Sequence, residues 1–173
     1  MNIRKRAMIA GLLVAAAVSG SGPADMQRPA PTTGPDIVSF AGVRNIAFGT
    51  TEQELTRRGV LDVEPESCGP RLAGVPTADP VFANDRLVLL WANGETSTPE
   101  GVHVGTPVAQ ARAAYPGARE LIAPSGSYRF DGLLVRAGDR AYLFLHDGRT
   151  VRKSIVGYAD YAQKLFDEGF GLC

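Results

Sequence analysis

The sequence has little of what reactive sites are made from. Only two of its 173 residues are cysteine and two are histidine, which leaves little material for a metal centre or a catalytic triad. Neither charge is in excess, since 18 lysines and arginines stand against 18 aspartates and glutamates, so no basic field draws the protein to nucleic acid. It contains no P-loop, dinucleotide fingerprint or EF-hand loop. We therefore predict a protein that is not an enzyme, with no catalytic, metal or cofactor site and no nucleic-acid partner.

The apolar run at the start of the chain is too short to cross a membrane. Ala7 to Val18 supplies twelve mostly apolar residues, whereas a spanning helix needs about 20. Three basic residues at 4–6 precede the run and small residues at 19–24 follow it, which is the pattern of a secretory signal peptide over 1–24. The alternative is an uncleaved anchor. We expect a secreted or extracytoplasmic protein with no integral membrane segment after signal cleavage.

The segment after the signal is rich in proline. Prolines at 29, 31 and 35 stiffen the chain and remove backbone donors, and little else in this stretch could pack. We expect a flexible lead over residues 25–38 and a globular domain over residues 39–173.

The two cysteines, Cys68 and Cys173, both lie in the exported part of the chain. An oxidising compartment and an even count favour a disulfide between them. Such a bond would close a loop of about 100 residues and add roughly 4–5 kcal/mol of stability in the chain-entropy model. The alternatives are two free thiols or one reactive thiol. Cys68 has no second cysteine in a CxxC motif, so disulfide-exchange catalysis is not indicated.

Hydrophobic periodicity predicts an α+β fold, with short helices packed on a mainly antiparallel sheet. Asp147-Gly148 between two alternating runs predicts a hairpin, and a final helix is expected at 160–168. Gly49-Thr50 opens another short helix that ends near Gly59, with Thr50 and Gln53 as a capping box. The expected strands are 42–48, 86–92, 120–123, 128–130, 133–136, 141–145 and 150–156.

The pattern before the first helix recurs 56 residues later. Gly-Thr occurs at 49–50 and again at 105–106, with apolar residues at the same two offsets before each pair. Val108, Ala111 and Tyr115 then share one face of a further short helix. We expect two half-repeats, 39–97 and 98–158. The alternative is a chance recurrence in a chain with 20 glycines.

The repeated segments resemble the superfamily of the β-lactamase inhibitory protein and the SmpA/OmlA (BamE) outer-membrane assembly lipoproteins. The residues that carry the resemblance are Phe48-Gly49-Thr50-Thr51-Glu52-Gln53-Glu54-Leu55 and Val104-Gly105-Thr106-Pro107-Val108-Ala109-Gln110-Ala111. The resemblance covers 41–156 and implies a helix-and-sheet repeat that binds another protein, by inhibition or by scaffolding. Two features depart from it: the inhibitor has a disulfide within each half, and the lipoproteins have a lipid-bearing cysteine after the signal, which is missing here.

One predicted strand has two chemically different faces. From Arg140 to His146, aliphatic side chains alternate with aromatic, charged or polar ones, and successive side chains of a strand point to opposite faces. If helices cover the aliphatic side, the other side is an open surface of the kind enriched at protein interfaces. The alternative is that these aromatic residues pack inside, against the other half-repeat or the last helix. The candidate interface residues are Tyr128, Phe130, Arg140, Tyr142, Phe144 and His146.

The function that we expect is that of a secreted, non-enzymatic protein-binding module, of inhibitor type if the resemblance holds. Two alternatives stay open. One is an envelope-associated structural adaptor, and the other is a small-ligand binder or hydrolase with a pocket between sheet and helices. Two carboxylates that converge in a deep cleft, or His146 beside an acid, would indicate the latter.

Overall fold

The computed structural model describes residues 36–62, 69–127 and 129–169. They belong to one compact unit, Thr32–Cys173. The predicted signal peptide and most of the predicted lead lie outside the described residues, and so do Cys68, Cys173 and Tyr128. The disulfide and one interface candidate therefore stay predictions.

The described residues form eleven strands and three helices, and the predicted α+β class is confirmed. In chain order the elements are β1 Val38–Ser39, β2 Gly42–Val43, β3 Ile46–Ala47, α1 Glu52–Arg57, β4 Leu61–Asp62, β5 Arg71–Leu72, β6 Ala78–Ala83, β7 Arg86–Ala92, α2 Val108–Ala114, β8 Arg119–Leu121, β9 Asp131–Ala137, β10 Arg140–His146, β11 Val151–Tyr158 and α3 Ala159–Glu168.

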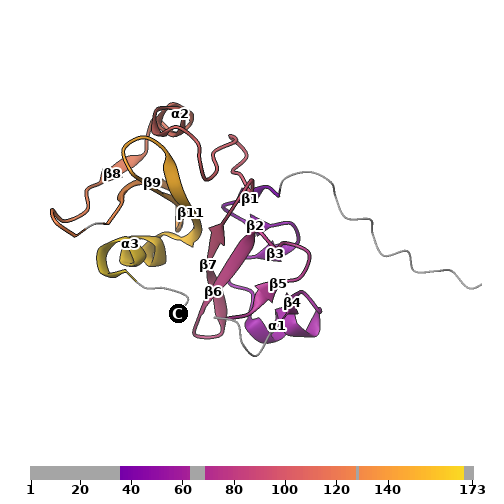
Figure 1. Ribbon diagram of the computed structural model, residues 1–173. Helices are drawn as coiled ribbons and strands as arrows, with labels where there is room; N and C mark the ends of the chain where they lie inside the picture. The colour runs from indigo at the N-terminus through magenta and orange to yellow at the C-terminus, as the bar shows by residue number, and fades with distance from the viewer. Residues whose placement is uncertain (1–35, 63–68, 128, 170–173) are drawn as a thin grey trace, which may run out of the picture. The chain divides into compact units, whose positions relative to one another are not determined.

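A six-stranded antiparallel sheet is the largest element of the described fold, with the order β6-β7-β11-β10-β9-β8 (Figure 1). The pairs β6–β7, β9–β10 and β10–β11 are hairpins between successive strands. The β6–β7 hairpin meets the β10–β11 hairpin where β7 pairs with β11, with Trp91 opposite Ile155. Two smaller antiparallel sheets, β1-β2-β3 and β4-β5, accompany it.

Both faces of the large sheet carry apolar side chains that pack against other elements. On one face, α3 lies against the sheet (Figure 1) and contacts β7, β9, β10 and β11. It inserts Ala162, Leu165 and Phe166 into the core. On the opposite face, the β1–β3 sheet, α1 and α2 supply Val43, Leu55 and other side chains to a second core. The sheet is therefore a central layer, and other elements pack on both of its faces.

The folded part of the chain begins earlier than predicted. Val38 is fully buried and donates its N–H to the carbonyl of Ser97 at 2.9 Å. Just before it, Asp36 accepts a hydrogen bond from Nε of Arg44 at 2.6 Å. The predicted flexible lead is thus wrong at its last three residues, because Val38 supplies a buried apolar side chain and the backbone of 36–38 pairs with that of Ser97.

Helix α1 is capped one residue later than predicted. The hydroxyl of Thr51, not that of Thr50, accepts a hydrogen bond from the N–H of Glu54 at 3.1 Å. The backbone of Thr50 is engaged elsewhere, since its carbonyl accepts the N–H of Leu87 in β7 at 3.0 Å. The helix ends before Gly59, whose φ of +65° suits glycine, and this agrees with the predicted end.

Three predicted segments differ in the structure. The single strand expected at 42–48 is divided into β2 and β3 by a turn in which Arg44 has a φ of +49°. The segment Asp131-Gly132, expected as a turn, lies inside β9, and the strand expected at 128–130 is not formed by its described residues. Strand β6 was missed because its Pro80 argues against a strand. Since β6 is an edge strand, a residue without an N–H is tolerated there.

The hairpins β6–β7 and β10–β11 have the same irregularity at equivalent places. The pairing register shifts between Val81 and Phe82 in the first hairpin. In the second hairpin the register shifts between Leu145 and His146. Each of these two residues lies 64 positions after its counterpart in the first hairpin. A bulge at a matching position in two hairpins indicates that they are built alike, because a bulge sets the local bend and twist of its strand.

The Gly-Thr pair before each helix is also bound to its hairpin in the same way. In each half the glycine donates its N–H to a residue of the hairpin's second strand, and that residue donates its own N–H to the threonine carbonyl. The four bonds join Gly49 N to Leu87 O at 2.9 Å, Leu87 N to Thr50 O at 3.0 Å, Gly105 N to Val151 O at 2.8 Å and Val151 N to Thr106 O at 2.9 Å. The described residues thus contain two similarly built segments.

Candidate functional site

The aromatic face of β10 is buried. Tyr142, Phe144 and His146 expose only 2%, 0% and 3% of their surface. Phe40 stacks on Tyr142 with ring centroids 4.1 Å apart, and Tyr115 stacks on Phe144 at 5.7 Å. Burial also raises the pKa of Tyr142 to about 12. The predicted open surface is therefore wrong for these three residues, because the N-terminal segment and the end of α2 cover it. The alternative, in which the aromatic residues are core, is confirmed.

The other predicted interface residues lie apart. Arg140 is at the far end of β10, with its guanidinium carbon 3.6 Å from the ring centroid of Tyr158 and with Asp139 as its ion-pair partner. Tyr128 lies outside the described residues. Phe130 is half-buried and borders a hollow together with residues that the sequence did not single out. Of the five candidates that the structure describes, Phe130 alone borders this hollow.

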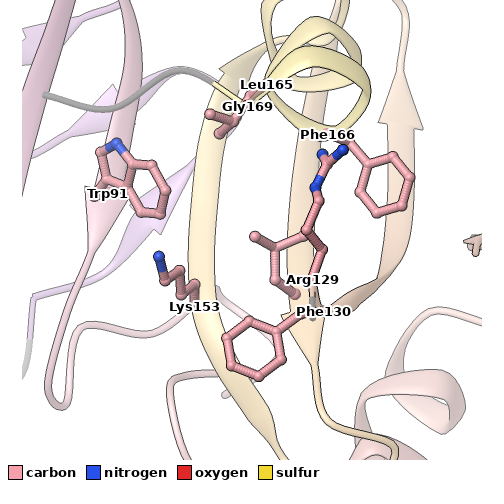
Figure 2. Close-up of a pocket in the computed structure, with 8 residues that line it drawn as sticks. Trp91, Arg129, Phe130, Lys153, Leu165, Phe166 and Gly169 are labelled. Atoms are coloured by element: carbon pink, nitrogen blue, oxygen red, sulfur yellow. The ribbon is translucent and has the colours of Figure 1, made fainter. Parts of the chain in front are cut away.

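The hollow beside Phe130, which we call the Trp91 hollow, has a volume of about 360 Å³ (Figure 2). This volume lies within the range of about 300–1,000 Å³ that is usual for ligand sites. In Figure 2, Trp91 and Lys153 stand across from Arg129 and Phe166. The described residues that line it are Trp91, Arg129, Phe130, Leu145, Lys153, Leu165, Phe166 and Gly169.

Strand alternation places the floor of the Trp91 hollow on the same sheet face as α3. Lys153 lies two residues before Ile155, which packs in the α3 core, so both side chains point to that face. Leu145 is the direct cross-strand partner of Lys153, and Trp91 is the partner of Ile155 on the neighbouring strand. Helix α3 ends at Glu168, and its C-cap residue Gly169 borders the hollow, so the helix does not extend over this part of the sheet.

Two cationic side chains flank the Trp91 hollow. Arg129 places its guanidinium carbon 5.5 Å from the ring centroid of Phe166, and Lys153 places Nζ 5.2 Å from that of Trp91. Both distances fit cation–π attraction. Arg129 also donates a hydrogen bond to the carbonyl of Asp167 at 3.1 Å. The site thus combines aromatic surface with two positive charges that are exposed to solvent.

A second hollow, the Tyr161 hollow, lies between α3 and the β6–β7 hairpin and has a volume of about 410 Å³. It is more aliphatic than the first, and its charged members, Lys164 and Glu168, pair with each other at 3.7 Å. The described residues that line it are Val81, Phe82, Ala83, Val88, Tyr161, Lys164 and Glu168.

His146 lies beside an acid but inside the protein. Its Nε2 is 3.9 Å from a carboxylate oxygen of Glu120, and it is the one buried side-chain nitrogen or oxygen without a hydrogen-bond partner in the described residues. Nδ1 accepts the N–H of Gly148 at 3.2 Å, so the neutral ring carries its hydrogen on Nε2. Arg112 holds Glu120 through two hydrogen bonds of 2.7 and 3.2 Å, which lower the pKa of Glu120.

This pair does not form a hydrolytic site with either hollow. His146 lines neither of them, and the described lining of both contains no serine, cysteine or histidine. Among the residues that the structure describes, no three of His, Cys, Asp and Glu come together as metal ligands. His146 is therefore a buried histidine beside the exposed carboxylate of Glu120, and it lines neither hollow.

We expect the burial of His146 to make the protein less stable in mild acid. Burial is the largest cause that lowers its pKa, Arg112 lowers it further, and Glu120, Asp131 and Asp147 only partly compensate. The unfolded chain, with an ordinary pKa near 6.5, therefore takes up this proton first as the pH falls, and the free energy of unfolding decreases. Urea titrations between about pH 7.5 and about pH 5.5 measure this slope.

The matched variant for this test is His146→Phe, because Phe82 occupies the equivalent position of the first hairpin. The variant removes the titrating group at a similar size, so the loss of stability between the two pH values is expected to be smaller than in the wild type. Equal slopes in the two proteins would contradict the role given to His146.

The sequence contained weak signals for the Trp91 hollow. Trp91 is the single tryptophan of the chain and lies in a strand that was predicted with its correct bounds. Lys153 interrupts the apolar pattern of β11 on the α3 face. What the sequence did not reveal is that Arg129 and Phe166 come to the same place from other parts of the chain.

The fold and its hollows define the class: an antiparallel α+β protein with an aromatic, cationic hollow beside its C-terminal helix. None of the described helices has the length and apolar character needed to cross a membrane. Comparison with models of protein families, with curated proteins and with solved structures finds no match to this chain. The resemblance to the β-lactamase inhibitory protein and the BamE lipoproteins therefore stays a prediction that rests on the residues quoted above.

Proposed function

We propose that the chain is a secreted, non-enzymatic protein-binding module and that the Trp91 hollow is its contact site. The observation that carries this proposal is the composition of the hollow. Trp91, Phe130 and Phe166 meet Arg129 and Lys153 there, and aromatic residues and arginine are the residue types that concentrate binding energy at protein interfaces.

Two further observations favour binding over catalysis. The side chains whose pKa is shifted by burial, Tyr115, Tyr142 and His146, belong to the opposite face of the sheet or to its interior and do not line the hollow. The groups that do line the hollow are suited to contact and charge recognition.

Export is proposed from the signal-like residues 1–24. Processed protein that is found in the culture medium but not in the cytosol would support it.

The test compares partners captured by the tagged full chain and by two variants. Trp91→Ala removes the largest side chain of the contact site. Tyr161→Ala, its matched control, removes an aromatic side chain from the Tyr161 hollow on the same sheet face. We expect a partner that binds the wild type and the control alike, and that binds Trp91→Ala more weakly by roughly tenfold or more. A partner that all three proteins bind equally would refute this contact site.

The volume of the Tyr161 hollow favours a second candidate function, the binding of a small apolar ligand. At about 410 Å³ it lies in the usual range for ligand sites, and its lining is largely aliphatic and aromatic. A ligand bound there would raise the thermal midpoint of unfolding of the wild type but not of Ala83→Trp, which places a large side chain at the half-buried rim of the hollow. If small apolar compounds raise neither midpoint, this candidate is rejected.

A further inference from the structure

The two cations of the Trp91 hollow lack negatively charged partners. Arg129 and Lys153 take part in none of the ion pairs formed within the described ranges. Arg129 uses one donor on the carbonyl of Asp167, and a guanidinium has five. Within the described part of the chain, the ammonium group of Lys153 lies over the face of Trp91 and has no hydrogen-bond partner.

The acidic residues near this place are already engaged with other groups. The carboxylate of Asp167 accepts a hydrogen bond of 2.9 Å from Nε2 of Gln163, and Glu168 forms an ion pair with Lys164. Asp79, the cross-strand partner of Trp91, accepts a hydrogen bond of 2.7 Å from Nδ2 of Asn93. The described lining of the hollow itself contains no acidic residue. Asp167 and Asp79 keep their negative charges, but among the residues that the structure describes no carboxylate lines the hollow or pairs with Arg129 or Lys153.

We propose that the Trp91 hollow binds an acidic peptide segment of the partner, in which a carboxylate side chain stands next to an aromatic or aliphatic one. This inference rests on the proposed protein-binding function and names the chemistry of its partner. The carboxylate would accept charge-assisted hydrogen bonds from Arg129 and Lys153. The apolar side chain would cover Trp91, Phe130 and Leu145, which are only half-buried in the free protein. A small inorganic anion would leave this apolar surface in water.

The experiment is a selection of random peptides displayed on phage against the immobilised full chain. The same selection is run on the double variant Arg129→Gln, Lys153→Gln, and on Lys164→Gln. Lys164 is the matched control because it is an exposed lysine on α3 that already pairs with Glu168 and borders the other hollow. We expect the wild type and the control to enrich peptides that combine Asp or Glu with an apolar neighbour, and the double variant to lose this enrichment.

Binding of an enriched peptide is then measured through the fluorescence of Trp91, which is the single tryptophan of the chain and stands in the hollow itself. We expect a saturable change in emission that weakens as salt is added. Replacing the carboxylate of the peptide by an amide should weaken binding by about tenfold or more, since it removes a charge-assisted hydrogen bond. The same replacement should have little effect on binding to the double variant.

The outcomes separate this inference from the proposed function. Enrichment of neutral or basic peptides, or binding that is indifferent to salt, overturns the acidic partner and leaves protein binding in place. Failure to enrich any peptide, together with no partner sensitive to Trp91→Ala, rejects both. Self-association of the wild type that the double variant abolishes would assign the hollow to a second copy of this chain and would also overturn the inference.

Discussion

Gly157→Ala is expected to destabilise the protein by about 3 kcal/mol or more, from overpacking against the backbone and from strain at this residue. Gly157 has a φ of +151°, and a Cβ placed on it would lie 2.1 Å from the carbonyl oxygen of Val88 and 2.9 Å from Cα of Leu89. These are backbone atoms of β7, so relief requires that β7 and β11 move apart. A loss of this size is a large part of the 5–15 kcal/mol that typically stabilises a domain.

The matched control is Gly117→Ala. A Cβ at Gly117 meets nothing within 4 Å, and this glycine has no positive φ. Gly117→Ala is expected to change the free energy of unfolding by less than about 1 kcal/mol in either direction. Unfolding in urea, followed by far-ultraviolet circular dichroism, measures both variants. If Gly157→Ala were as stable as the control, the close approach of β7 and β11 at this residue would be wrong.

Where local chemistry decides the structure, the sequence predicted it well. Strand β7 has the predicted bounds, 86–92, because a compact apolar run ends at the turn residues Asn93-Gly94. The hairpin at Asp147-Gly148 and the last helix, which ends just before Gly169, were also predicted within two residues. In each case the signal lies within a few neighbouring residues.

Where a distant segment decides, the sequence was insufficient. Alternation along β10 shows that its two faces differ, but not that Phe40 and Tyr115 cover the aromatic one. Strand β6 could not be predicted from a segment with Pro80 unless its place at the edge of the sheet was known. The N-terminal cap of α1 was misplaced for the same reason, since pairing with β7 fixes the backbone of Thr50.

The Trp91 hollow illustrates this limit for function. Its floor comes from β7, β10 and β11 and its wall from α3 and the segment before β9, so no short motif contains it. Only Phe130 was predicted as an interface residue, and it was expected beside Tyr142 and Phe144. The reasoning that aromatic residues and arginine mark an interface holds equally for both faces. Burial alone distinguishes them, and burial is set by the whole fold.

Phe144→Ala is expected to cost about 3–5 kcal/mol in the free energy of unfolding, as for other phenylalanines that are deleted from a packed core. Phe144 is fully buried and stacks on Tyr115 and on Tyr142, with ring centroids 5.7 and 5.8 Å apart. Its truncation therefore removes apolar burial and leaves a cavity between the sheet and the elements that cover it. Urea unfolding at neutral pH measures the change.

The control for this prediction is Phe130→Ala, which truncates the same side chain at a half-buried place beside the Trp91 hollow. Less apolar surface is lost there, so its cost is expected to be below about 1.5 kcal/mol, while any binding at the hollow weakens. The two phenylalanines would thus divide the roles that the sequence assigned to one surface: Phe144 stabilises the fold, and Phe130 belongs to the proposed contact site. A small cost for Phe144→Ala would restore β10 as an exposed face, because only an uncovered ring can be removed at so little loss of stability.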